Sequence, residues 1–130
     1  MSTRTHLAPY PVLNAVSMAT NQIGVTFLKS MSVISYDISW TGTSPLGTIT
    51  IEVSNSYKAN PDGSTAVAGH WNAVPFQNST GTIVQAIAVS GNTGSAFIDI
   101  RITGAEAIRI VYTATSGTGS LTAIISGKVT

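Results

Sequence analysis

The stretch SVISYDISWTGTSPLGTITIEVS, residues 32–54, decides the fold of this chain. Its first half alternates small or charged side chains with large apolar ones at Ile34, Tyr36, Ile38 and Trp40. Its second half repeats the pattern with Ile49, Ile51 and Val53. Because successive side chains of a β-strand point to opposite faces, each half predicts a strand with one buried face. Pro45 and two glycines lie between the halves, so we expect a hairpin over residues 32–54.

Similar alternating runs fill most of the remaining chain. The turn sequence SGTGS at residues 116–120 predicts a C-terminal hairpin over residues 107–129, and NPDG at residues 60–63 predicts a tight turn in a long loop. About eight strands are expected, at residues 22–28, 32–41, 48–54, 70–76, 82–90, 95–102, 107–115 and 121–129. The predicted fold class is therefore all-β, an antiparallel sandwich or jelly roll of two sheets.

The N-terminal segment lacks this alternation and contains Pro9 and Pro11. We expect an extended N-terminal arm over residues 1–21, followed by a single β-sandwich domain over residues 22–130. The segment is too apolar for a plain disordered tail. It is predicted to be an assembly arm that makes its contacts through Leu7, Tyr10, Val12, Leu13, Val16 and Met18. Packing on its own domain and packing on a neighbouring subunit are both open at this point.

Charge limits the partners of the protein. Only 8% of the 130 residues are charged and the net charge is +1, whereas about 25% are charged in an ordinary soluble domain. The charges are spread singly and form no basic stripe, so no nucleic-acid partner is expected. A surface with so little charge fits permanent assembly, in which neighbouring subunits cover it. An uncharged β domain of the extracellular type is the alternative.

The sequence predicts neither a membrane span nor a bound cofactor. No run reaches the roughly 18 consecutive apolar residues of a membrane helix, and Pro9, Pro11 and Asn14 interrupt any signal-peptide core. Cysteine is absent, which excludes disulfides and cysteine-based metal sites.

No group of residues predicts catalysis. His6 and His70 have no acid partner nearby in sequence, so a Ser/His/Asp arrangement can be neither built nor wholly excluded. Asp37, Glu52 and Asp99 lie at outward positions of predicted strands, where exposed acids are ordinary, and Asp37 could face Glu52 across the first hairpin. We therefore expect a protein that is not an enzyme.

Aromatic residues beside the long loop indicate an alternative binding role. Tyr57 and Trp71 flank this loop, and His70 is adjacent to Trp71. Since sugar-binding sandwiches stack a pyranose ring on an exposed aromatic side chain, Tyr57, His70 and Trp71 are the candidate platform for a surface glycan. Burial of Trp71 in the core, beside Trp40, is the competing interpretation.

Four segments together carry a family resemblance: WTGTSPLGTITIEVSNS (residues 40–56), HWNAVPF (70–76), GSAFIDI (94–100) and AIRIVYTATSGTGSLTAIISGK (107–128). In this order they resemble a group of small β-sandwich virion proteins of tailed bacteriophages. The resemblance covers residues 33–129 and implies a discoidin-like or jelly-roll sandwich displayed on a virion. It implies no catalytic residues, and the N-terminal segment lies outside it.

Together these features predict a non-enzymatic structural protein located in a phage virion, either a capsid decoration protein or a head- or tail-associated protein. Its expected partners are copies of itself, with a trimer preferred, and other virion proteins such as capsid or tail subunits. The alternative is a carbohydrate-binding or adhesin-type tip domain on a tail fibre.

Overall fold

The computed structural model describes residues 6–28, 31–101 and 105–128, and within these ranges every regular element is a β-strand. The predicted all-β class is confirmed. None of the described residues belongs to a helix that could cross a bilayer. The strands are β1 (His6–Ser17), β2 (Gln22–Phe27), β3 (Val33–Ser54), β4 (Lys58–Ala59), β5 (Thr65–Val67), β6 (Asn72–Ala73), β7 (Phe76–Gln77), β8 (Ile83–Val84), β9 (Ile87–Val89), β10 (Thr93–Arg101) and β11 (Ala107–Lys128).

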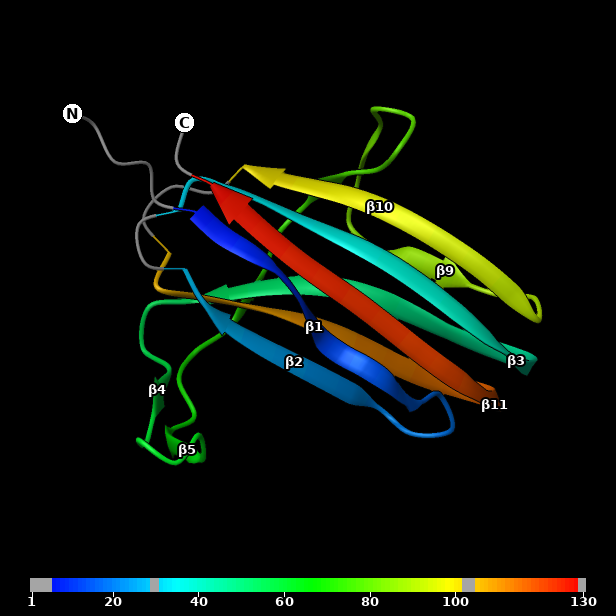
Figure 1. The fold of residues 1–130 in the computed structure, drawn as a ribbon, viewed down its shortest axis with the longest axis horizontal. Helices are drawn as coiled ribbons and strands as arrows, with labels where there is room; N and C mark the ends of the chain where they lie inside the picture. Colours follow the sequence, from blue (N-terminus) through cyan, green and yellow to red (C-terminus); the bar gives the residue numbers. More distant parts are fainter. Residues whose placement is uncertain (1–5, 29–30, 102–104, 129–130) are drawn as a thin grey trace.

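The two longest strands organise the fold. β3 and β11 run antiparallel along their whole length, from the pair Val33 and Lys128 to the pair Ser54 and Ala107. Each strand folds back near its middle, so its two halves lie in different layers (Figure 1). The first sheet contains, in spatial order, β1, residues 120–128 of β11, residues 33–41 of β3, β10, β7 and β8. The second sheet contains β2, residues 107–114 of β11 and residues 47–54 of β3, and β6 and β9 pair with this part of β3.

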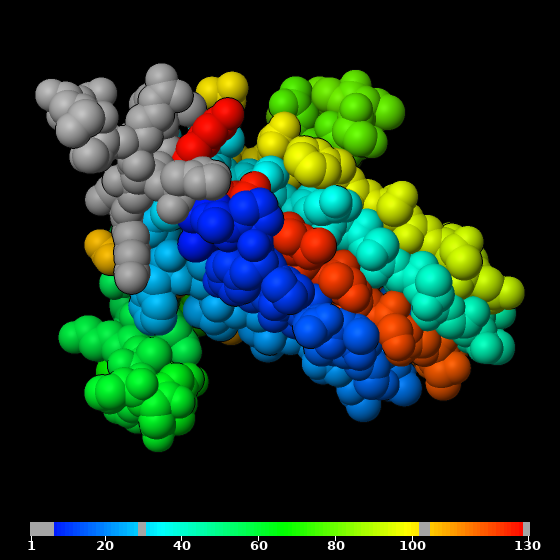
Figure 2. All heavy atoms as spheres, in the orientation of Figure 1, coloured from blue at the N-terminus to red at the C-terminus, as the bar shows by residue number. Residues whose placement is uncertain are grey.

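The inner faces of both sheets form one hydrophobic core. The alternation in the sequence predicted which side chains point inward, and these include Ile34, Ile38, Ile51 and Ile110. Tyr36 is also fully buried, and loss of hydration raises the pKa of its phenol far above the ordinary value, so this hydroxyl stays neutral. In Figure 2, four strands of the first sheet lie side by side on one face of the molecule, in the order β1, β11, β3 and β10.

The predicted hairpins at residues 32–54 and 107–129 are wrong in their pairing. The turns occur where expected, but the two halves of each segment do not pair with each other; each half pairs with the other long strand. The reason is burial, because a turn that crosses between layers brings the two apolar faces together. A flat hairpin would place both strands in one sheet, and other residues would then have to cover its apolar face.

The crossing needs glycine where the two turns meet. Gly117 has a φ of +82°, and a Cβ at this position would collide with the carbonyl oxygen of Ser44. A Cβ on Gly42 would collide with the carbonyl oxygen of Thr118. The backbones of the two turns are therefore in direct contact, which only glycine permits.

The segment expected to be an arm is a strand of the sandwich from His6 to Ser17. β1 pairs with β11, placing Leu13 opposite Ala123 and Val16 opposite Leu121. Leu13 and Met18 are only 3% and 0% exposed, while Leu7, Val12 and Val16 pack against the same core and Tyr10 stays partly exposed. Two prolines fit an edge strand, and the register shifts along β1 explain why its sequence shows no period of two.

We predict that Gly117→Ala lowers the free energy of unfolding by more than 2 kcal/mol, since about 1–2 kcal/mol for positive φ adds to the backbone collision. Gly63→Ala is the control, because Gly63 also has positive φ, +91°, but a Cβ there meets nothing within 4 Å. Urea denaturation of both variants gives the comparison. Equal losses would show that the crossing tolerates a side chain.

Candidate functional site

The structure brings two of the three predicted platform residues together. The rings of Tyr57 and Trp71 lie 5.4 Å apart between centroids and are tilted by 54°. Phe27 extends the cluster, with its ring 5.7 Å from that of Tyr57. All three rings are at least partly exposed, so the interpretation of Trp71 as a core residue is wrong, whereas Trp40 is buried.

An ion pair lies beneath this aromatic cluster on the outer face of the second sheet. Arg109 and Glu52 are cross-strand neighbours on β11 and β3, and both Nε and one terminal nitrogen of Arg109 lie 2.6 Å from Glu52 Oε1. The Arg109 guanidinium carbon is 4.3 Å from the centroid of the Trp71 ring, which is a cation–π distance. Trp71 Nε1 donates a hydrogen bond to the carbonyl oxygen of Ala68 at 2.9 Å. Trp71 is thus fixed over the ion pair.

His70 does not join the rings of the cluster. Its side chain is exposed, and its backbone N–H donates to Ser56 Oγ at 2.8 Å. It lines a separate hollow of about 550 Å³ together with Asn55 and Asn72. The predicted platform is therefore an aromatic pair beside an exposed histidine, and the remaining histidine side chain, that of His6, lies outside the described residues.

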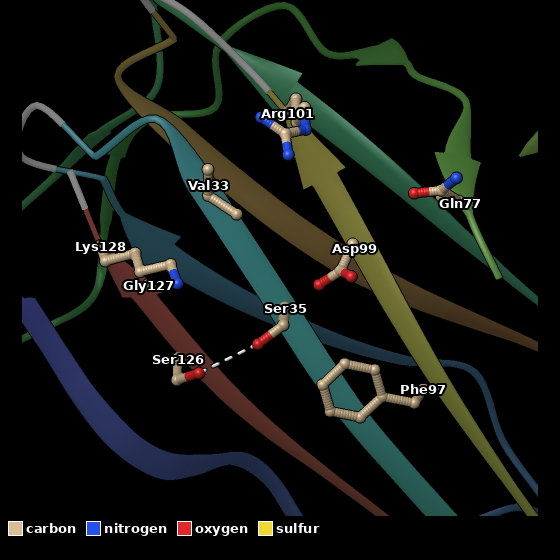
Figure 3. A pocket seen from close by; sticks show the side chains of 9 residues that line it. All are labelled: Val33, Ser35, Gln77, Phe97, Asp99, Arg101, Ser126, Gly127 and Lys128. Carbon is tan, nitrogen blue, oxygen red and sulfur yellow. Dashed lines mark hydrogen bonds between the residues drawn. The ribbon is translucent and has the colours of Figure 1, made fainter. Parts of the chain in front are cut away.

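A second hollow, of about 500 Å³, lies on the outer face of the first sheet and is drawn in Figure 3. Its centre is a row of polar side chains across four strands, because Gln77, Asp99, Ser35 and Ser126 are successive cross-strand partners on β7, β10, β3 and β11. The hydroxyls of Ser35 and Ser126 are hydrogen-bonded to each other at 3.0 Å. The row presents hydrogen-bonding groups along an open sheet surface.

Asp37 and Asp99 are diagonal neighbours on the outer face of the first sheet, whereas Glu52 lies on the second sheet. Asp37 is on the first sheet, opposite Ile124, whereas Glu52 is on the second sheet, opposite Arg109, so these two acids do not face each other across a hairpin. Among the residues that the structure describes, no three His, Asp or Glu side chains gather in a way that could hold a metal ion.

The fold and its surfaces define a class: an antiparallel β-sandwich whose two sheets share their longest strands. No family model matches the chain, and no curated protein is significantly similar to it in sequence. A solved structure with a similar fold is that of the SPBc2 prophage-derived protein YomS, at a TM-score of 0.61 and 12% identity over 97% of this chain and 96% of that one. The sandwich fold is thus shared with a prophage-derived protein, and the discoidin-like form stays a prediction.

Sequence reasoning missed Phe27 and Arg109 in the aromatic cluster and all of the hollow in Figure 3. Alternation placed Arg109 outward, but its contact with Trp71 depends on the return of the loop over the second sheet. The polar row depends on strand order, which no local pattern encodes. Only the contact between Tyr57 and Trp71 could be expected from the sequence, because a single loop separates these two residues.

We predict that Arg109→Lys lowers stability by about 1 kcal/mol, because lysine keeps the charge but loses the planar group that stacks on Trp71 and binds Glu52 through two nitrogens. The environment of Trp71 should change, giving a shifted tryptophan emission spectrum. Arg101→Lys is the control, since Arg101 is exposed and forms no ion pair with any described residue. Identical unfolding curves for the two variants would contradict the role given to Arg109.

Proposed function

We propose that this protein is a non-enzymatic structural component of a bacteriophage particle, a capsid decoration protein or a head- or tail-associated protein, and that it acts by assembling with copies of itself and other virion proteins. The observation that carries the proposal is the apolar outer face of the second sheet. A buried inner face is required for folding, whereas an apolar outer face is not, so its presence favours a covering neighbour.

This outer face is built mainly by β2 and its neighbour β11. Ile23 and Phe27 on β2 are 51% and 39% exposed. Val111, the cross-strand partner of Ile23, adds a half-exposed apolar side chain, and Thr50 on β3 continues that row without charge. The only charges in the adjacent row, Arg109 and Glu52, neutralise each other. Such a surface can be buried without leaving an unpaired charge.

Two further findings support the phage assignment. The fold is similar to that of a prophage-derived protein over nearly the whole of both chains. The chain also has 8% charged residues, which fits a protein surrounded by neighbours on a lattice.

The role of the N-terminal segment changes in this proposal, since Leu13 and Met18 pack in the core of their own domain. Leu7, Val12 and Val16 pack against the same core, so Tyr10, which is 38% exposed, is the predicted arm residue that remains a candidate for contact with a neighbour.

We predict that the protein is present in phage particles. Gold-labelled antibody raised against the full chain should decorate particles released from the strain that carries the gene, at a fixed position on the head or tail. Particles from a strain in which the gene is deleted provide the control. Labelled protein found only in the particle-free supernatant would contradict the proposal.

We also predict that self-association depends on the outer face of the second sheet. Ile23→Thr should raise the dissociation constant of the oligomer at least fivefold in light scattering over a concentration series, because it replaces apolar contact area while keeping a β-branched side chain. Ile83→Thr is the matched control, since Ile83 is 64% exposed on β8 of the other sheet. A wild-type chain that is monomeric at every concentration would contradict self-assembly.

The alternative, a carbohydrate-binding tip domain, depends on Trp71 as a stacking surface. One face of the Trp71 ring lies against Arg109, and the ring of Tyr57 also contacts Trp71. These contacts favour a structural role for this tryptophan. Retained binding in a glycan screen after Trp71→Ala would exclude the platform at this position.

A further inference from the structure

The hollow on the first sheet has a cationic side beyond its polar row. Arg101, Val33 and Lys128 are cross-strand partners on β10, β3 and β11. The two cations are thus separated by two strand spacings, about 10 Å between Cα atoms, with a small apolar side chain between them. Both are exposed, and neither forms an ion pair with any other residue in the described part of the chain. An anion placed above Val33 could contact both (Figure 3).

The polar row lies two residues further along the strands, about 6.6 Å from the cationic one. Its Asp99 carboxylate only accepts hydrogen bonds, while the hydroxyls of Ser35 and Ser126 use one contact on each other and keep further capacity. The Gln77 amide, at the edge of the hollow, can both donate and accept. This combination suits a ligand with several hydroxyl groups, since each hydroxyl needs an acceptor for its proton.

An aromatic ring borders the opposite side of the hollow. Phe97 lies two residues from Asp99 on the same face of β10 and is 46% exposed, although a phenylalanine ordinarily favours burial. Its ring can cover the apolar C–H face of a sugar. Along β10, an apolar surface, a hydroxyl acceptor and a cation therefore follow one another at the spacing of alternate residues.

From this order we infer that the hollow binds an acidic sugar, a hexuronic acid or a residue of similar chemistry. The carboxylate lies between Arg101 and Lys128, the ring hydroxyls bond to Asp99 and the two serines, and the C–H face lies toward Phe97. A phosphate group would use the cations alone, whereas a uronic acid also uses the hydroxyl acceptors of the polar row and the ring of Phe97. The site is on the sheet opposite to the aromatic cluster and is independent of the proposed assembly face.

The test compares glucuronate with glucose, which differ at the carboxylate. In amide NMR spectra of the full ¹⁵N-labelled chain, millimolar glucuronate should shift signals of residues 33–35, 97–101 and 126–128, and glucose should bind at least tenfold more weakly. Lys128→Gln or Arg101→Gln should weaken glucuronate binding at least tenfold and Phe97→Ala at least fivefold. Lys58→Gln, at an exposed lysine on β4, is the matched control and should change nothing.

An alginate oligomer tests whether the ligand is a polysaccharide or a free acidic sugar. Tighter binding of the oligomer than of glucuronate assigns a polysaccharide as the ligand, and equal binding assigns the free sugar. The inference is overturned if glucuronate shifts no signals in the hollow, if glucose binds equally well, or if Lys58→Gln weakens binding as much as Lys128→Gln. It is also overturned if the Arg101 and Lys128 variants alter only the oligomeric state. Failure of this test leaves the antibody labelling of particles unaffected.

Discussion

The full-length antiparallel pairing of β3 with β11 is the constraint on which the rest of the structure depends. These two strands supply the central positions of both sheets, so the sandwich is held together by hydrogen bonds that continue from one layer into the other as well as by its core. Seven other strands attach to this pair directly or through β10 and β7, whereas β4 and β5 pair only with each other. The close contact of the two turns, with Gly42 against Thr118 and Gly117 against Ser44, fixes where the layers separate.

The sequence predicted the long alternating strands, their faces and the turns, because alternation and turn residues are local signals. The single strands expected at residues 70–76 and 82–90 are wrong, since each region holds two short strands, β6 and β7 in the first and β8 and β9 in the second. Ile34, Ile38 and their partners point inward as expected. Strand pairing could not be predicted in the same way, since a glycine-rich turn suits a hairpin and a crossing between layers equally. The choice depends on what covers the apolar face, a question about the whole chain. β1 was mistaken for an arm for a related reason, because its bulges remove the period of two that identifies a strand.

In both surface sites, contacts between residues that are near in sequence could be predicted, whereas contacts between distant strands could not. Tyr57 and Trp71 are separated by a single loop, so their contact could be anticipated. Arg109 reaches Trp71 only because β11 lies beside β3 in the second sheet, and the polar row of the first sheet needs four strands in the right order. A chain with few charges makes such sites hard to find in sequence, because each one is assembled from single charged residues that are far apart along the chain.

The attachment of β1 to β11 also determines when the protein can fold. β1 finds its hydrogen-bonded partner in β11, and β3 likewise pairs with β11, so neither pairing exists until β11 has been synthesised. Domains dominated by such distant pairings fold slowly, since long loops must close before contacts compensate for the lost entropy. During synthesis on the ribosome, β1 and β3 therefore remain without this shared partner until β11 has emerged.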